Sequence, residues 1–498
     1  MSETTAPAAT TAAGSDSLPA NSIGLFGTTS STLANIAPAL SVFLTIPAIV
    51  ISMGSMAPWA FVLAAIAILA TGNSLIEFTR RMPSAGGFIS YITRASRRGR
   101  RPRPIQHSSL AGGGKPATFL GSMTFYLLLF IYPVSVGSVV VFIGSWTVSY
   151  ANWAPGVWIW VTLGAMVAGL PVLLRGTGIS VKAAFTMFLT EAVALVIFAV
   201  VVLVRAHSAL GIPFHSIGGS PGGFAGIGGL TFGLAVFAYV GWENSAPLAE
   251  ESRNPRRTIP LTVVLSIGVV MVVFFLAAYA LVVGYAGWQG GAKGMTSIGA
   301  LANPYLTLTS HYVPWLHLIM FLIGITSSFG CYLAAGLPGS RYIYHGSRAG
   351  LLPSQLSRVS PRTGVPYASI TLYVALMVAT TVILDLVLHS AGSIATYEAG
   401  ISTVPVLIIY GATCALLPFF VWRVDRGTFS VLRHVVYPVL GVGVVGYGIW
   451  ESINPSQAAP ANHYWYYVLA YLVVGAAGGL YALRSRGPRA DVLSRGLE

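Results

Sequence analysis

Charged residues are scarce in this chain: only 8% of its 498 residues are Asp, Glu, Lys or Arg, whereas soluble domains carry about 25%. Hydrophobic residues make up 55% of the chain, which excludes a water-soluble globular protein. Apolar runs of about 20 residues, long enough to cross a bilayer, recur along the whole sequence. They lack the strict alternation of barrel strands, so their backbone groups must be satisfied within helices. The composition predicts an all-α polytopic membrane protein embedded in the lipid bilayer.

Cysteine and histidine are also few, and neither forms a pattern typical of an active site. Cys331 and Cys414 both lie within apolar runs, so no disulfide framework is predicted. The nine histidines form no cluster with metal-ligand spacing, and neither cysteine has an activating neighbour in sequence. A channel would need a repeated filter or rings of like charge, and none appears. We therefore expect neither an enzyme nor a channel, and no metal or cofactor.

Basic residues outnumber acidic ones by 27 to 13, and their placement predicts the orientation in the membrane. Twelve spans are predicted, near residues 30–51, 58–78, 117–148, 155–174, 179–204, 228–250, 260–286, 312–346, 366–388, 394–422, 434–452 and 463–483. Between these spans, 25 of the 27 Lys and Arg residues fall on one face, and only Arg205 and Lys293 fall on the other. The positive-inside rule makes the crowded face cytoplasmic, with both termini inside the cell. This placement explains the net charge of +14 without a nucleic-acid partner.

The ends of the chain and one connection are expected to lie outside the helical domain. Residues 1–22 are small and polar, so we expect a disordered cytoplasmic tail. Residues 97–116 are expected to form a basic cytoplasmic loop that sets the topology, and 486–498 a second cytoplasmic tail. The predicted twelve-helix domain occupies 23–485 of this multi-pass protein of the cell membrane.

Two of the predicted spans contain a helix breaker near the centre. Pro38 in the first span lacks a backbone donor and clashes with the preceding turn, so a break is predicted just before it. Gly241 is the weak point of the sixth span. Because these breaks are five spans apart, we expect two inverted repeats, about 23–206 and 225–423, and two extra helices at 434–483. Broken helices at corresponding positions of such repeats indicate a substrate site between them.

At each break, one half-helix exposes backbone N–H groups and the other exposes carbonyl groups. Pro38 fits the first position of the half-helix that follows it, so the next N–H groups are expected to face an anionic group. The carbonyl groups before Gly241 suit an ammonium group, and an amino acid zwitterion matches both ends. The donors are those of Ala39, Leu40 and Ser41, the carbonyls are those of Phe237, Ala238 and Val240, and Ile36, Ala37 and Gly241 complete the predicted substrate-binding set.

Glu243 is a carboxyl inside the sixth span, where its charge is costly unless it faces the bundle interior. It falls in the first turn of a half-helix, whose positive dipole end stabilises negative charge. One hypothesis is that Glu243 only ties down the broken backbone, and the other is that it is a protonatable group that couples or shapes the site. Glu191 and Glu398 are further carboxyls within spans. Each either favours a cationic or amine substrate or carries a proton, or it only makes a hydrogen bond to a neighbouring helix.

Three segments carry motifs in order, at matching spans. They read "RRMPSAGGFISY" (80–91), "FAYVGWE" followed by "AEESRNPRRTIP" (237–260), and "RYIYHGSRAGLLP" (341–353). With these motifs, the chain resembles the amino acid–polyamine–organocation (APC) superfamily over nearly its whole length. The resemblance implies a secondary transporter of amino acids or related amines. It also implies a leucine-transporter-type fold of five plus five inverted spans that works by alternating access.

The resemblance also implies roles for individual residues. Phe237 corresponds to the aromatic residue that closes over the substrate, and Tyr132 would line the same pocket. Thr326 and Ser327 fall near the place where sodium-coupled members hold an ion with hydroxyl groups. Other members use protons, and we favour a proton over sodium here, with exchange as an alternative. The coupling candidates are Glu243, Glu191, Thr326 and Ser327.

The sequence departs from the superfamily pattern at the first break. A Gly-x-Gly segment is usual there, whereas this chain has Ala37-Pro38-Ala39-Leu40. Leu40 narrows the approach and Pro38 removes one donor, so the usual binding of a carboxylate is not assured. A polyamine or cationic amine carrier therefore remains an alternative, as does a nutrient sensor of the same fold that does not transport.

Overall fold

The computed structural model consists of helices throughout the part of the chain that it describes. The described residues are 23–84, 86–96, 114–210, 226–227, 230–249, 251–289, 297–301, 303–454 and 461–484. Within these ranges, β pairing is limited to an isolated bridge between Ile23 and Ser252. The expected tails at 1–22 and 486–498, and nearly all of the expected loop at 97–116, lie outside the described residues.

Ten segments of the described residues are long and apolar enough to cross a membrane. The first, Leu25–Arg81, holds three helices and covers the first two predicted spans: α1 (Leu25–Ile36), α2 (Pro38–Met53) and α3 (Ala57–Arg81). The predicted sixth span is divided into α8 (Leu230–Phe237) and the 3-10 helix η5 (Trp242–Leu248). Neither piece is long enough to count among the ten.

The other predicted spans are continuous helices. They are α5 (Gly114–Ala151), α6 (Trp158–Leu174), α7 (Thr177–Leu210), α9 (Pro255–Gln289), α12 (His317–Arg348), α13 (Tyr367–Leu388), α14 (Ala391–Val424), α15 (Tyr437–Ile453) and α16 (Tyr464–Arg484). Two shorter α-helices, α4 (Gly87–Ala95) and α11 (Pro304–Tyr312), lie between spans. Short 3-10 helices occur at Gly54–Met56, Pro155–Val157, Ile298–Ala300, Pro314–Leu316, Ser354–Ser357, Arg426–Thr428 and Ala461–His463, and a π-helix at Leu432–Val436.

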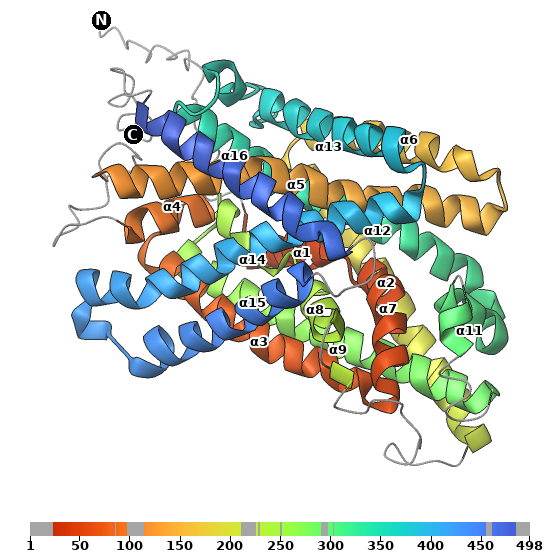
Figure 1. The fold of residues 1–498 in the computed structure, drawn as a ribbon. Coiled ribbons are helices and arrows are strands. Elements are labelled where there is room, and N and C mark those ends of the chain that lie inside the picture. The colour runs from red at the N-terminus through yellow and green to blue at the C-terminus, as the bar shows by residue number, and fades with distance from the viewer. Residues whose placement is uncertain are drawn as a thin grey trace, which may run out of the picture.

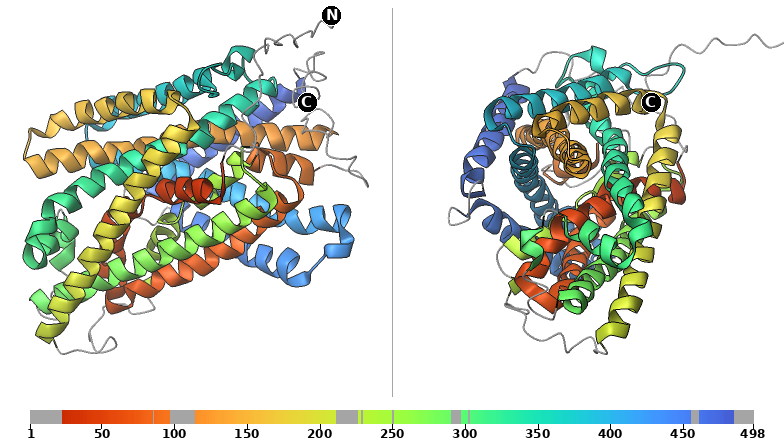
Figure 2. Two further views of the ribbon diagram at one scale, coloured as in Figure 1. Left: turned by 180° about the vertical axis from the view of Figure 1, so that it is seen from behind. Right: turned by 90° about the vertical axis from the view of Figure 1, so that its right-hand side faces the viewer.

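The long helices form one bundle, and its two ends are marked by the short helices. We call them the α4 end and the α11 end; α16 finishes at the α4 end, where α5 begins (Figure 1). The broken helices lie inside this bundle: α1 contacts α7, α9, α12 and η5, and α2 contacts α7, α8, α9 and α12. Figure 2 shows the same arrangement from behind and along the bundle. One continuous hydrophobic core surrounds both breaks.

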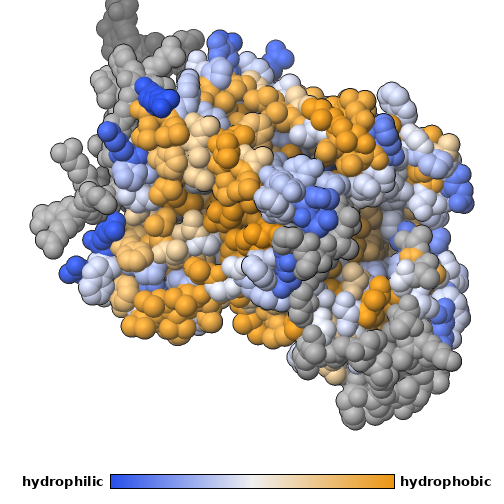
Figure 3. Space-filling model, viewed as in Figure 1, coloured by the Kyte–Doolittle hydropathy of each residue, from blue (hydrophilic) through white to orange (hydrophobic). Residues whose placement is uncertain are grey.

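Small residues allow the helices to approach closely, as is common where helices pack in membranes. Gly169 in α6 lies against the ring of Tyr332 in α12, where a β-carbon would overlap the ring. The outer surface carries large apolar side chains instead, including Trp160 and Val387, which are 71% and 72% exposed. Hydrophobic residues cover wide areas of the face seen in Figure 3. Such a surface fits lipid, since it would be unfavourable in water.

Candidate substrate site

The first break lies between α1 and α2, where Pro38 predicted it. Ala37 has φ 51° and ψ 68°, a left-handed conformation that cannot continue a right-handed helix. Pro38 is the first residue of α2, a position where its missing N–H costs no helical hydrogen bond. The break is deep inside the protein, because Ile36, Ala37 and Ala39 are all buried.

The second break lies between α8 and η5, and Gly241 adopts the conformation that opens it. Its φ of 108° lies in the region that favours glycine. A β-carbon there would lie 2.8 Å from the Nδ2 atom of Asn35 and 3.0 Å from the Asn35 backbone. Glycine is therefore required for two reasons: it allows this backbone conformation, and its lack of a side chain lets Asn35 at the first break approach closely.

The two breaks are in direct contact. The Nδ2 atom of Asn35 donates to the carbonyl oxygen of Gly241 at 3.4 Å. The hydroxyl of Ser41 lies 3.3 Å from the carbonyl oxygen of Ala238, to which it donates, and 3.1 Å from that of Ile36. The fold thus brings the predicted residues of the first and sixth spans to one place.

The N–H groups at the start of α2 have acceptors from the protein itself. Ala39 donates to the Oε2 atom of Glu191 at 3.0 Å, and Leu40 donates to the hydroxyl of Ser327 at 3.2 Å. The Ser41 N–H donates to the carbonyl of Ala37 at 3.0 Å, as in the first turn of a helix. Glu191 and Ser327 therefore reach the break from α7 and α12, and a carboxylate already occupies the position expected for an anionic group.

The carbonyl groups before Gly241 keep part of their accepting capacity. The Phe237 carbonyl accepts from the Val240 N–H at 2.9 Å, and the Ala238 carbonyl accepts from Ser41. Each carbonyl oxygen has two lone pairs, so a second donor can still bind. The side chains of Phe237 and Val240 are half-buried.

Glu243 links the second break to α5. Its Oε2 atom accepts from the Gly241 N–H at 3.1 Å, and its Oε1 atom accepts from the Tyr132 hydroxyl at 3.2 Å. The residue is only 3% exposed. The Tyr132 ring lies 5.3 Å from that of Tyr342 in α12. The carboxyl thus ties the broken backbone, as the first hypothesis required, and also holds a side chain of another span.

The two hydroxyl residues of α12 differ in their contacts. Ser327 contacts α2, whereas the Thr326 hydroxyl donates to the Ile323 carbonyl of its own helix at 3.5 Å. Asn35 and Cys331 also belong to the site, although neither was among the candidates. The Cys331 thiol donates to the Asn35 carbonyl at 3.0 Å. A polar residue three positions before the breaker was the signal for Asn35, while Cys331 resembles any cysteine in an apolar run.

Glu398 lies away from both breaks, on α14. Its Oε1 atom accepts from the Thr381 hydroxyl of α13 at 2.9 Å. Its Oε2 atom is buried and has no hydrogen-bond partner among the described residues. Gly137 of α5 provides the space for this carboxyl.

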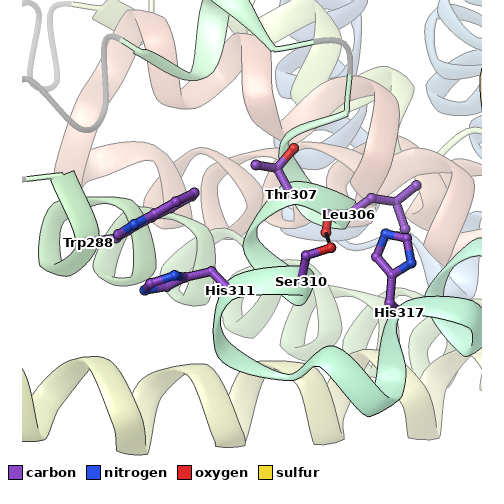
Figure 4. A pocket seen from close by; sticks show the side chains of 6 residues that line it. All are labelled: Trp288, Leu306, Thr307, Ser310, His311 and His317. Carbon is purple, nitrogen blue, oxygen red and sulfur yellow. Dashed lines mark hydrogen bonds between the residues drawn. The ribbon is translucent and has the colours of Figure 1, made fainter.

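A separate pocket of about 430 Å³ opens at the α11 end of the bundle. Trp288 stacks on His311 with ring centroids 4.3 Å apart, and His317 lies on the other side of the pocket (Figure 4). Its lining residues are Trp288, Leu306, Thr307, Ser310, His311 and His317. None of the predicted site residues is among them.

A model of the amino acid permease family matches residues 23–476, nearly the whole chain. The chain belongs to the amino acid permease family. Its predicted membership of the APC superfamily is thereby confirmed. This permease is a multi-pass membrane protein, and its family is one of transporters rather than enzymes.

Three curated relatives are 24–28% identical to this permease over the segments that match. An uncharacterized amino acid permease of Bacillus subtilis, YecA, is 24% identical over 79% of this chain and 83% of its own. The branched-chain amino acid permease BcaP of Lactococcus lactis is 26% identical over 38% of this chain and 40% of its own. The mitochondrial cationic amino acid transporter 3 of Arabidopsis thaliana is 28% identical over 28% of this chain and 22% of its own. For the last two relatives, the match spans less than half of the relative's length.

The permease motif that follows the sixth span forms a buried ion pair. Glu251 accepts from Arg341 of α12 through two hydrogen bonds, Nε to Oε1 at 2.8 Å and Nη2 to Oε2 at 3.2 Å. Both side chains are at most 1% exposed. Ile23 pairs with the same segment, because its N–H donates to the Glu251 carbonyl and its carbonyl accepts from Arg253. These contacts fasten the start of α1 to α12 and to the end of η5.

Proposed function

We propose that this permease is a secondary active transporter that moves amino acids or related amines across the cell membrane by alternating access. The contact between the breaks at Ala37 and Gly241 carries the proposal, because it joins two broken spans that are five spans apart. That arrangement is typical of a substrate site between inverted repeats. The proposal includes twelve spans in a five-plus-five fold, with α15 and α16 outside the repeats and both termini in the cytoplasm.

The substrate would lie beside the two breaks. Its ammonium group would bind the carbonyls of Phe237, Ala238 and Val240, at the negative end of α8. The half-buried ring of Phe237 would close over the substrate. Ile36, Ala39 and Leu40 would form the opposite wall.

Coupling to a proton is favoured over coupling to sodium. Glu243 and Glu191 are buried carboxyls in contact with the breaks, and such groups are typical of proton relays in transporters. The Thr326 hydroxyl bonds to its own helix, which is less suited to holding an ion. A sensor that does not transport would keep the same contacts, so measured flux must separate it from a carrier.

Glu243→Gln tests the coupling role in vesicles that contain the purified protein. Gln keeps the shape of the side chain and an acceptor for the Gly241 N–H, but it cannot titrate. We expect loss of uptake driven by a pH gradient, by about tenfold or more, with substrate exchange at equal pH retained. Glu398→Gln, which changes a buried carboxyl far from the breaks, should retain both. Full gradient-driven uptake by Glu243→Gln would contradict the coupling role, and absence of flux from the wild-type protein would favour a sensor.

Phe237→Ala tests the closing residue. Removing the ring should lower uptake by about tenfold while the abundance of folded protein stays nearly unchanged, because the side chain is only half-buried. Phe232→Ala is the matched control on the same half-helix. The Phe232 ring packs on Tyr447 of α15, 5.9 Å between centroids, so its loss should leave uptake unchanged. Equal uptake by the two variants would exclude a specific role for Phe237.

A further inference from the structure

Glu191 occupies the part of the site that an amino acid substrate needs for its carboxylate. A helix start binds an anion through free N–H groups and a positive dipole end. At α2 the Glu191 carboxyl holds that place, with its Oε2 atom 3.0 Å from the Ala39 nitrogen. It is 1% exposed and comes from α7, 152 positions along the chain. The Ser327 hydroxyl, which accepts a hydrogen bond from the Leu40 N–H, lies beside the same carboxyl.

A substrate carboxylate would have to displace Glu191 or lie next to it. Two carboxylates within about 4 Å repel each other strongly in a buried site, where the charges are poorly screened. Among the described residues, no buried basic side chain is left to compensate for them. Arg341 is the one fully buried Lys or Arg among the described residues, and Glu251 already pairs with it.

The other half of the site suits a cation. The end of α8 presents carbonyl groups at Phe237 and Ala238, and Glu243 lies buried at the same break. Together with Glu191, the site has two carboxyls and a negative helix end. An ammonium group complements this charge, and a second negative group on the substrate does not.

We propose that Glu191 takes the place of the substrate's own carboxylate, so that this permease selects primary amines without an α-carboxylate over the corresponding amino acids. This selectivity rests on the transport function proposed above. Of the two substrate classes named there, it assigns the amine. Glu191 is then the residue that determines specificity at the first break.

Pairs of compounds that differ only in the α-carboxylate provide the test. They are phenethylamine and phenylalanine, 3-methylbutylamine and leucine, putrescine and ornithine, and cadaverine and lysine. Uptake and counterflow are measured in vesicles with the full chain, and thermal stabilisation is measured on the purified protein. For at least one pair, we expect the wild-type protein to take up the amine at a concentration at least tenfold lower than the amino acid requires.

Glu191→Ala frees the Ala39 N–H group and removes the repelling charge, so the preference for the amine should fall by about tenfold or more. Glu191→Gln keeps an acceptor for Ala39 but loses the charge, and an intermediate preference is expected. Glu398→Ala removes a buried carboxyl elsewhere and should leave the preference unchanged. If Glu191→Ala does not fold, the wild-type pairs and Glu191→Gln still decide.

The outcomes separate this inference from the proposed function. Wild-type uptake of an amino acid, equal to or better than its amine in every pair, would overturn the inference and leave the transport function standing. An unchanged preference in folded Glu191→Ala would also overturn it. If no compound gave either flux or thermal stabilisation, both proposals would be contradicted.

Discussion

At both helix breaks a carboxylate accepts a hydrogen bond from a free backbone N–H, but the two carboxylates reach that position differently. Glu243 binds the N–H of Gly241, two positions earlier in the same segment. Glu191 binds the N–H of Ala39 from α7, 152 positions away. The left-handed residue differs as well: it is glycine at the second break and alanine at the first.

The hydrogen bond at the first break, unlike the one at the second, depends on the arrangement of the helices. The Glu243 contact is local, so it persists wherever the sixth span moves. The Glu191 contact exists only while α7 and α2 are side by side, and a rearrangement of these helices would expose the N–H group and the carboxylate together. Exposing such groups is unfavourable in an apolar interior. Of the two, the first break is therefore the one whose hydrogen bonding would change if these helices moved apart.

The largest expected effect is at the second break. Gly241→Ala would place a β-carbon against Asn35 at a backbone φ that alanine rarely adopts, which should cost about 2–5 kcal/mol of stability. Gly233→Ala is the control on α8, where, apart from the local helix itself, no atom of the described residues lies within 4 Å of an added β-carbon. Thermal unfolding of the detergent-solubilised variants measures both. Equal stability of the two would show that the contact between the breaks is loose.

The position of both breaks could be predicted from sequence because each depends on one local residue. Pro38 disfavours a continuous helix, and Gly241 is the residue best able to adopt a positive φ. The long apolar spans were predictable for the same reason, since each is a continuous run. The approach of Asn35 to Gly241 was not, because it depends on tertiary packing.

A smaller effect is expected from the contact between Glu243 and α5. Tyr132→Phe removes the hydroxyl that donates to Glu243 and should cost about 1–3 kcal/mol, because a buried carboxyl oxygen loses its partner. Tyr373→Phe is the matched control: its hydroxyl is buried and has no hydrogen-bond partner among the described residues. Its removal should be nearly neutral in the same unfolding measurement. If Tyr132→Phe is equally neutral, the local bond to Gly241 is enough to hold Glu243.

The partners of the candidate residues were beyond the reach of sequence. Glu191, Ser327 and Cys331 were visible as polar residues in apolar runs, but nothing in their spacing indicates that they meet the first break. Helices α7 and α12 reach it only through tertiary packing. Glu243 was the opposite case, since its contact with Gly241 spans two residues.

The smallest effect is expected at the first break, and its sign is informative. Ala37 holds a left-handed conformation that costs a residue with a β-carbon about 1–2 kcal/mol, whereas glycine adopts it freely. Glycine also loses more chain entropy on folding, so Ala37→Gly should raise the free energy of unfolding by no more than about 1 kcal/mol. The same change at Ala39, inside the first turn of α2, should lower it by about 1 kcal/mol. Both variants remove one methyl group at buried positions two residues apart, so lost packing is similar and the backbone decides the sign. Destabilisation of similar size by both would mean that Ala37 bears no strain, and the two breaks would then differ only in the origin of their carboxylates.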